Sequence, residues 1–542
     1  MHVSISKRRP RTSKKTETEK HEKSLKDHPN SICSVFSSLV LYLVLLTILF
    51  LFLISLWSTS TTVVSGNVVR ICISSRKLND LYCLTAGSHY PGLRVPVSNF
   101  TKLVSENITK KEISTEEEPY RYIVPKDEVE ESGLKDVNKY LKIQRSWLSI
   151  GNNQRSCKGQ GIYVYDLPSK FNKDLLGECS DMFPWANFCS YFKNDGFGES
   201  IEELGERWFN THQYSLEPIF HSRVLKHPCR VYDENQAKLF YVPFYGGMDV
   251  LRWHFKNIST DVKDVLAIKL LKWLGSKSSW RKNSGKDHVF VLGKITWDFR
   301  RKEHYSCISS FLEMQEMKNP TKLLIERNPW EVIDIAIPHP TFFHPRTDDD
   351  ISSWQNKIIR QSRRSLISFA GGARPGNPKS IRSTLIDQCT SSPNQCRFLN
   401  CTSGGCNKPE LVMELFQDSE FCLQPPGDSP TRKSVFDSLI SGCIPVLFDP
   451  FTAYYQYTWH LPEDHRLYSV YINQDDLKAN KVNVIKKLMS VTLRERENMR
   501  SYIVHELLPG LVYGDSSAKF QRFRDAFDIT VDSLLHKIST TL

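Results

Sequence analysis

The longest apolar run of the chain lies near its N-terminus. Residues 29–69 contain no Asp, Glu, Lys or Arg, and VFSSLVLYLVLLTILFLFLISLW at 35–57 is almost entirely apolar. A helix of this length, rising about 1.5 Å per residue, crosses a hydrocarbon core of about 30 Å. Basic residues cluster before the run, and no signal-peptide cleavage site follows it. The pattern predicts a cytosolic basic tail (1–34), a single transmembrane signal-anchor helix (35–57) and a lumenal remainder, which is a type II orientation.

Short β-branched and aromatic runs recur farther along the chain. They are GIYVYDLP, AKLFYVPFY, DHVFVLG and KLLIE, and segments with helical spacing, such as 262–274, separate them. Strands that alternate with helices indicate a parallel α/β sheet. We therefore expect a Rossmann-like lobe at 156–350. It follows a lumenal stem at 58–155, which begins with Ser and Thr and carries the acidic run 116–118.

A second series of strand-like runs begins after the Asp-rich stretch at 347–350. SLISFAGG, EFCLQPPG and GCIPVLFDP each end in Gly or Pro, and the segment 484–511 has helical periodicity. A chain of 542 residues also exceeds what one hydrophobic core usually organises. The pattern predicts a second Rossmann-like lobe at 351–542 that ends in helices.

The charge of the chain limits the classes of ligand that it is expected to bind. The formal net charge is +12, but no compact Lys/Arg stripe interleaved with aromatic residues is present. The absence of such a stripe excludes nucleic-acid binding, whereas the net positive charge is compatible with an anionic small ligand.

Cysteines and glycosylation sequons agree with a lumenal location. Of 14 cysteines only Cys33 lies before the apolar run, and an oxidising lumen favours disulfides over zinc for the 389–406 cluster, which lacks a CxxC pair. We expect at least one lumenal cysteine to stay unpaired or to pair between chains. The expected glycosylation acceptors are Asn99, Asn107, Asn257 and Asn400.

The most informative segment is FCLQPPGDSPTRKSVFDSLISGCIPV at 421–446. It indicates a strand, a Gly/Pro loop, a helix and a strand, which is half of a nucleotide-binding unit. Gly427 permits close approach of the backbone to a ligand, and Ser429 and Pro430 are expected to start the helix, whose free N–H groups attract a pyrophosphate.

Side chains in and after this loop supply further candidate contacts. Arg432 and Lys433 are candidates for charge-assisted bonds to phosphates, Thr431 lies beside them, and Asp437 suits the ribose hydroxyls. Gly371, Gly372 and Arg374 form a second strand-end turn that is expected to border the same phosphates. The alternative interpretation is that Arg432 and Asp437 are ordinary surface residues with no role in binding.

The 421–446 segment, with TAYYQYTWHLP after it, resembles the C-terminal signature of the exostosin family, glycosyltransferase family 47, in its plant xyloglucan galactosyltransferase branch. The likeness extends through IYVYDLPSKFN, YVPFYGGMDV, GKDHVFVLGKITWDFRR, IPHPTFFHP and FAGGARPGNPKSIRSTLIDQC, and so covers about 157–530. One departure is Ser434, which stands where many exostosin-like proteins have Arg. It leaves open which cation meets the phosphates.

The resemblance implies a GT-B-type enzyme of the Golgi membrane that transfers galactose from UDP-galactose to xylosyl side chains of xyloglucan, with inversion and without a metal. Alternatives are another UDP-sugar such as UDP-galacturonic acid, another cell-wall acceptor, or a non-catalytic scaffold subunit in a complex with other wall-synthesis glycosyltransferases. Residues in the resembling motifs supply candidate general bases. Asp249 and Asp298 share the lead, and the competing interpretation for both is a helix cap or salt bridge. Glu217 and His288 are weaker candidates, and His288 is expected to be a buried, hydrogen-bonded strand residue.

Other residues allow less specific interpretations. The run Asp348, Asp349, Asp350 could chelate a cation, but a solvated acidic loop is the favoured interpretation. His339 and His344 in a Pro-rich turn favour packing over metal binding. Candidate platforms for sugar rings are Trp297, Tyr454, Tyr455 and Trp459, against the alternative that they belong to the core.

Overall fold

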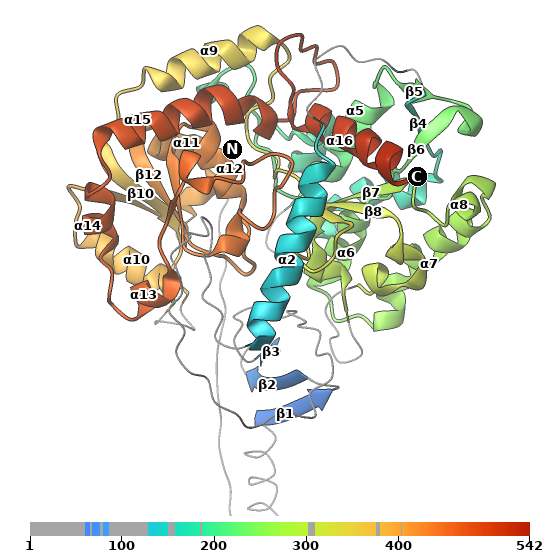
Figure 1. Ribbon diagram of the computed structural model, residues 1–542, viewed down its shortest axis with the longest axis horizontal. Coiled ribbons are helices and arrows are strands. Elements are labelled where there is room, and N and C mark those ends of the chain that lie inside the picture. The colour runs from blue at the N-terminus through green and yellow to red at the C-terminus, as the bar shows by residue number, and fades with distance from the viewer. Residues whose placement is uncertain are drawn as a thin grey trace, which may run out of the picture. The chain divides into compact units, whose positions relative to one another are not determined.

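The computed structural model describes residues 60–65, 68–75, 80–85, 128–149, 157, 159–184, 187–301, 309–374, 380–402 and 404–542 (Figure 1). Its first unit is a small antiparallel sheet, described by its backbone, with strand order β1 (Ser60–Ser65), β2 (Val68–Ser75), β3 (Asp80–Thr85). No helix in the described ranges is long and apolar enough to cross a membrane. The tail and anchor predicted at 1–57, and the sequons at Asn99 and Asn107, lie outside those ranges.

The second unit contains two parallel sheets. The N-terminal lobe holds six strands, which in spatial order are β5 (Arg230–Val231), β4 (Gly161–Val164), β6 (Ala237–Val242), β7 (His288–Ile295), β8 (Thr321–Glu326) and β9 (Asp334–Ala336). The C-terminal lobe holds five, which are β11 (Cys396–Asn400), β10 (Ser365–Gly371), β12 (Ser419–Gln424), β13 (Ile444–Leu447) and β14 (Val470–Tyr471). The α/β architecture with two parallel sheets is therefore confirmed.

Alternation along the N-terminal strands decides which helices cover which face. In β6, Phe240 and Val242 belong to one apolar cluster, and Leu239 and Tyr241 to another, because successive side chains point to opposite faces. The first cluster includes residues of α6 (Gly246–His254) and α7 (Thr260–Gly275), and the second includes α5 (Leu216–Leu225) and α16 (Ala526–Thr541). Strands buried on both faces explain the nearly continuous apolar runs of the sequence.

Further helices belong to both lobes. Those of the N-terminal lobe are α3 (Lys173–Gly177), α4 (Lys193–Gly196) and α8 (Ser278–Lys282). Those from residue 348 onwards are α9 (Asp348–Ile359), α10 (Ile381–Thr390), α11 (Pro409–Gln417), α12 (Lys433–Ile440), α13 (Gln474–Lys478), α14 (Val484–Met489) and α15 (Leu493–Tyr502).

Two helices depart from a simple division of the chain into lobes. Helix α16 comes last in the sequence but packs on the N-terminal sheet, with Val531 and Leu534 in the same cluster as Ile162 (Figure 1). Helix α2 (Glu128–Ser146) falls within the stretch expected to be a stem, yet its Gln144 contacts both lobes. The side-chain amide of Gln144 donates to the backbone carbonyl of Asp334 at 2.8 Å, and the backbone carbonyl of Gln144 accepts from Trp459 Nε1 at 2.8 Å.

Candidate functional site

Two strand-to-helix loops of the C-terminal lobe lie side by side. Residues 425–432, here called the 425–432 loop, follow β12, and residues 372–374 follow the neighbouring strand β10. Both leave the carboxyl edge of a parallel sheet, where α/β folds bind their ligands.

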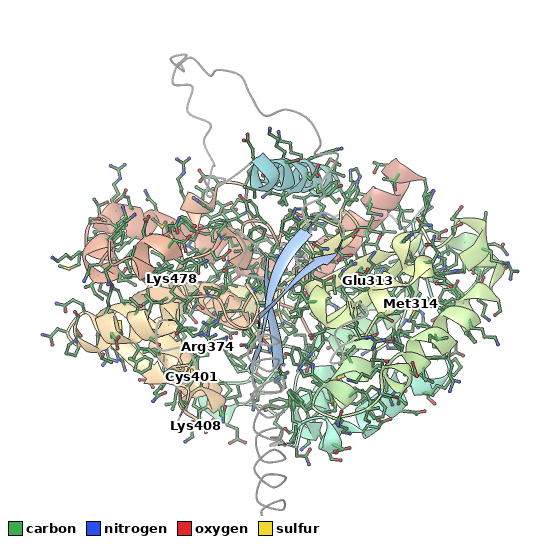
Figure 2. The ribbon with its side chains drawn as sticks, turned by 90° about the horizontal axis from the view of Figure 1, so that it is seen from below. Glu313, Met314, Arg374, Cys401, Lys408 and Lys478 are labelled. Atoms are coloured by element: carbon green, nitrogen blue, oxygen red, sulfur yellow. A yellow bond between two sulfur atoms is a disulfide. The ribbon has the colours of Figure 1, made fainter. Side chains whose placement is uncertain are left out.

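Three arginines converge on the 425–432 loop. Burial, together with the nearby guanidinium groups of Arg382 and Arg374, lowers the pKa of Arg432 to about 9. Arg374, labelled in Figure 2, forms an ion pair with Asp428, whose side chain is 98% exposed. Asp428 is the one carboxylate that raises the pKa of Arg432 or Arg382. The cluster therefore carries a surplus of positive charge and suits an anion with more than one charge.

Unsatisfied donors lie in the same place. Among the described residues, Arg382 Nε and Gln424 Nε2 are buried without a hydrogen-bond partner. Gln424 is the last residue of β12, and its Oε1 accepts a 2.6 Å bond from the Ser434 hydroxyl, which fixes the amide. Buried donors normally have partners, so these two are candidate contacts for a ligand or a water molecule. Sequence reasoning missed both; Arg382 lies in a quoted motif, but only the fold brings it to the loop.

Side chains are disfavoured at the glycines of these loops for different local reasons. A Cβ on Gly427 would lie 3.3 Å from Arg382 Nη2, so a side chain here would crowd the guanidinium. A Cβ on Gly371 would lie 2.4 Å from the Phe369 ring, and one on Gly372 would lie 2.9 Å from Thr402 Oγ1. Gly427 thus lies beside the arginine cluster, while the other two glycines are required by packing.

Helix α12 begins later than the sequence suggested. Ser429 and Pro430 were expected to cap it, but the helix starts at Lys433 with Arg432 as its N-cap. The reason is a tertiary contact, because Glu326 at the end of β8 accepts hydrogen bonds from Thr431 N at 2.9 Å and Thr431 Oγ1 at 2.6 Å. This carboxylate of the other lobe keeps the residues before Arg432 out of the helix.

Lys433 and Asp437 lie at the contact with the N-terminal lobe. The ammonium group of Lys433 lies 2.8 and 2.9 Å from the two carboxylate oxygens of Asp437 and 3.1 Å from the ring centre of Phe342 in the N-terminal lobe. Burial raises the pKa of Asp437, and the Lys433 charge opposes that rise. Of the two adjacent cations, Arg432 therefore lies in the arginine cluster and Lys433 at the lobe interface. The predicted ribose contact of Asp437 stays a prediction.

The two leading base candidates are both ion-paired. Asp298 accepts from Lys294 Nζ at 2.8 Å. Burial lowers the pKa of Lys294, but Asp298 and Tyr214 together outweigh it, so the pKa lies above its ordinary value. Asp249 pairs with Arg252 at 2.6 Å, and burial raises its pKa to about 6 against the pull of that guanidinium. Both carboxylates are at least nine-tenths buried.

Glu217 and His288 have structural partners. The Glu217 carboxylate accepts from Gly247 N at 2.5 Å and Gly293 N at 3.1 Å, so it caps the start of α6, and burial raises its pKa to about 8. His288 is fully buried, its Nε2 lies 2.9 Å from the Tyr165 hydroxyl, and its Nδ1 lies 2.7 Å from Asp287 Oδ1. The expectation that His288 is a hydrogen-bonded strand residue is confirmed.

His212 lies where the two lobes meet and was not among the expected residues. Burial, together with the charges of Lys433 from α12 and Lys294 from β7, lowers its pKa to about 3. Its Nδ1 accepts from Tyr214 N at 3.2 Å, which leaves the proton of the neutral ring on Nε2. Asp298 directly follows Trp297, which donates to Glu326, and Glu326 also accepts from Thr431 just before α12, so Asp298 lies on the side of the N-terminal lobe that contacts this part of the C-terminal lobe.

The acidic run at 348–350 is the first turn of a helix rather than a solvated loop. Thr347 and Asp350 form a capping box at the start of α9, and Asp348 accepts from the backbone N–H groups of Gln521 and Arg522. In the described ranges no group of three His, Cys, Asp or Glu side chains is placed to hold a metal ion.

The histidine and aromatic candidates differ in how far they are buried. His344 bonds Thr211 Oγ1 at 2.8 Å and the carbonyl of Tyr513 at 2.7 Å, and His339 lies 3.3 Å from the Tyr457 hydroxyl, so both serve packing. The aromatic residues Tyr454, Tyr455 and Trp459 are all buried. Trp297 alone of the four candidate platforms is half-buried, and its Nε1 donates to Glu326 at 2.7 Å.

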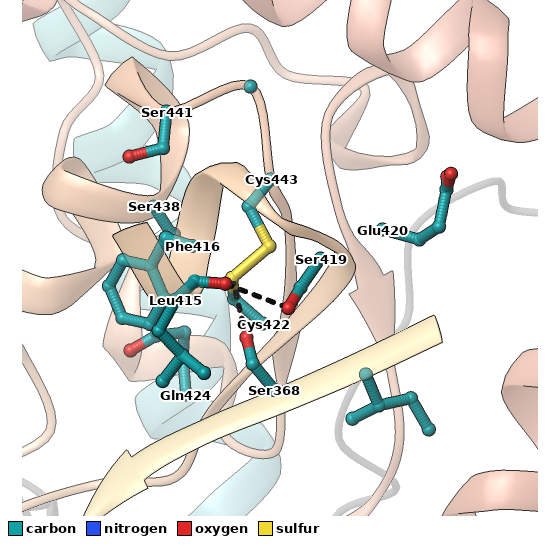
Figure 3. Close-up of a disulfide and its surroundings, with 12 residues drawn as sticks. Ser368, Leu415, Phe416, Ser419, Glu420, Cys422, Gln424, Ser438, Ser441 and Cys443 are labelled. Carbon is teal, nitrogen blue, oxygen red and sulfur yellow. Dashed lines mark hydrogen bonds between the residues drawn. A yellow bond between two sulfur atoms is a disulfide. The ribbon is translucent and has the colours of Figure 1, made fainter. Parts of the chain in front are cut away.

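The four cysteines of the 389–406 cluster, which were considered as zinc ligands, form two of five disulfides in the described residues. The pairs are Cys157–Cys229, Cys179–Cys189, Cys389–Cys396, Cys401–Cys406 and Cys422–Cys443. The last pair joins β12 to the residue before β13 and so closes the segment that contains the 425–432 loop and α12 (Figure 3). The sequons at Asn257 and Asn400 are both on exposed residues.

Comparison with known proteins gives consistent matches. Residues 156–488 match the family described as Exostosin GT47 domain. The chain is 65% identical to the Arabidopsis thaliana protein "Xyloglucan-specific galacturonosyltransferase 1", over 100% of this chain and 96% of the relative. It is 60% identical to "Probable xyloglucan galactosyltransferase GT20" of the same organism, over 99% and 100%. Identity to "Xyloglucan galactosyltransferase MUR3", also from Arabidopsis thaliana, is 39% over 76% of this chain and 67% of the relative.

Proposed function

We propose that this chain, which belongs to the exostosin GT47 family and is a glycosyltransferase, transfers a galactose or galacturonic acid unit from a UDP-sugar to xylosyl side chains of xyloglucan. The proposal includes a GT-B-type reaction between the two Rossmann-like lobes and a location in the Golgi membrane. The acceptor and the two candidate sugars follow the names of the relatives.

The observation that carries the proposal is the arginine cluster at the 425–432 loop. Arg374, Arg382 and Arg432 supply three positive charges against the one negative charge of Asp428. The surplus of two equals the charge on the diphosphate of a UDP-sugar. Guanidinium groups bind phosphate oxygens in pairs, and the free donors of Arg382 and Gln424 are available for the same oxygens.

The same groups favour the chemical step. When an acceptor hydroxyl attacks the anomeric carbon, the bond to the diphosphate breaks and the leaving UDP gains negative charge, which preorganised cations stabilise. The hydroxyl proton passes to a carboxylate on the N-terminal lobe. We assign that base to Asp298 rather than Asp249, because its partner Lys294 acts on the same imidazole as Lys433 of α12.

The proposed reaction needs no metal ion. Three arginines supply the charge that a divalent cation would otherwise bring to the diphosphate. Transfer by the purified full-length protein is therefore expected to continue in excess EDTA, and restoration of lost activity by Mn²⁺ or Mg²⁺ would contradict this part of the proposal.

The relatives favour two donors. The galacturonosyltransferase is 65% identical, and a probable galactosyltransferase is 60% identical, so both UDP-galacturonic acid and UDP-galactose must be tested. The full-length protein in detergent is incubated with each donor and a xyloglucan oligosaccharide, and the product is read by mass spectrometry. Addition of one hexose or one hexuronic acid supports the proposal and identifies the donor. If neither donor gives product while UDP still binds, the chain is better explained as a scaffold subunit.

A further inference from the structure

One fully buried carboxylate joins the two lobes at the 425–432 loop. Glu326 ends β8 of the N-terminal lobe, and its side chain has no exposed surface. Its Oε2 accepts from Thr431 N and Thr431 Oγ1, and its Oε1 accepts from Trp297 Nε1 at 2.7 Å. The Ser429 hydroxyl also bonds to it. Both oxygens of Glu326 thus already accept hydrogen bonds.

Glu326 bonds both to the proposed donor-binding loop and to a candidate sugar-stacking residue of the N-terminal lobe. Thr431 directly precedes Arg432, whose Nη1 donates to the carbonyl of Pro425 at 2.8 Å and so closes the 425–432 loop. Trp297 lies after β7 and is the half-buried aromatic candidate for sugar stacking. A shift of either partner therefore changes the hydrogen bonds of the other through one carboxylate.

The contact also decides where α12 begins. With Thr431 N bound to Glu326, the helix starts at Lys433, and Arg432 takes the extended conformation of an N-cap, at φ −150° and ψ 137°. In an uninterrupted helix from Pro430, Arg432 would point in another direction. The direction of Arg432 is thus set by a residue of the other lobe.

We propose that Glu326 is a positioning residue that holds the 425–432 loop in its phosphate-binding shape and couples that loop to Trp297. The inference rests on the proposed function for its catalytic consequence, but not for its structural one. Glu326 does not act as the base, because both its oxygens are already bonded and no part of it is exposed.

The test combines three variants of the full-length protein. Glu326→Gln keeps the shape but replaces one acceptor oxygen by a donor, Glu326→Asp keeps the charge, and Thr431→Val removes the hydroxyl donor alone. The control is Asp525→Asn, which alters a fully buried carboxylate that pairs with Arg223 at 2.7 Å. Hydrogen exchange of a peptide covering 425–432 is measured by mass spectrometry, with UDP affinity and transfer kinetics alongside.

The Gln variant is expected to exchange the Thr431 amide at least about tenfold faster and to lose about tenfold in kcat, because the loop loses its anchor. The Asp variant should recover part of both losses, and the Val variant should show a smaller change in kcat. The Asp525→Asn control should leave exchange of this peptide unchanged.

Unchanged exchange in Glu326→Gln would overturn the positioning role, whatever happens to the rate. Lost activity together with unchanged exchange would instead place Glu326 in direct contact with substrate. The exchange readout needs no sugar donor, so an absence of transfer by the wild-type protein would count against the proposed function and leave this inference testable.

Discussion

Lys433 and Asp437 form an ion pair one helical turn apart on α12, with both carboxylate oxygens within 2.9 Å of the ammonium group. The Asp437 side chain is 4% exposed and that of Lys433 is 13% exposed, and the ammonium group also lies against Phe342 of the other lobe. The pair therefore serves the interface between the lobes before any ligand is bound.

Replacing Asp437 by Ala is expected to destabilise the protein by about 3 kcal/mol, because it leaves the Lys433 ammonium buried without its partner. Thermal unfolding followed by calorimetry measures the change. The double variant Lys433→Met/Asp437→Ala should recover much of the loss, since it removes the unpaired charge.

The double variant also separates stability from ligand binding. If Asp437 holds the ribose, UDP affinity measured by calorimetry should stay reduced even when stability is recovered. Full recovery of UDP affinity would show that Asp437 acts through Lys433 alone.

Substitution of Arg432 or Arg382 by Ala is expected to lower UDP affinity by about 10- to 100-fold, since each removes charged hydrogen-bond donors from a desolvated site. Titration calorimetry with UDP is the measurement. The matched control is Arg346→Ala, which removes an exposed arginine whose ion-pair partner, Asp515, is not part of this loop. Wild-type affinity in both cluster variants would remove the observation on which the proposed donor site rests.

Glu217 should make stability depend on pH. Burial raises its pKa in the folded protein to about 8, above its ordinary value near 4.5, so the folded state retains a proton that the unfolded state releases. Its contribution is therefore present below about pH 4.5 and is lost as pH rises towards 8, at up to roughly 1.4 kcal/mol per pH unit. Denaturant unfolding of Glu217→Gln at several pH values should show the variant gaining on the wild type across this window.

The control for that experiment is Glu203→Gln, an exposed glutamate of the same lobe. It should follow the wild type at every pH. A constant difference between Glu217→Gln and wild type from pH 4.5 to 8 would mean that Glu217 is ionised throughout.

Removal of the Cys422–Cys443 disulfide is expected to cost roughly 3 kcal/mol, because it closes a loop of 21 residues in the unfolded chain. The double alanine variant is compared with the one that removes Cys401–Cys406, whose separation of 5 residues predicts a smaller loss of roughly 2 kcal/mol. Unfolding temperatures give the order. UDP affinity should fall only in the first variant, since only that loop contains Gly427 and Arg432.

Local pattern determined the elements of this protein. The apolar runs that indicated strands correspond to β4, β6, β7, β8, β10, β12 and β13, because a strand buried on both faces is apolar along its length. The helix expected at 262–274 is α7, Thr260–Gly275. The Gly/Pro loop before α12 was visible for the same reason, since its residue types favour turns over helix.

Contacts between distant residues determined the site. Glu326 delays the start of α12 from 105 positions earlier in the chain, and Arg382 reaches the loop from the neighbouring strand-to-helix unit. Lys294 converts Asp298 from a free carboxylate into half of a buried ion pair. The last helix, α16, returns to the first sheet. None of these leaves a signal in local hydrophobic spacing, because burial, ion pairing and the direction of a side chain depend on partners that only the folded chain brings together.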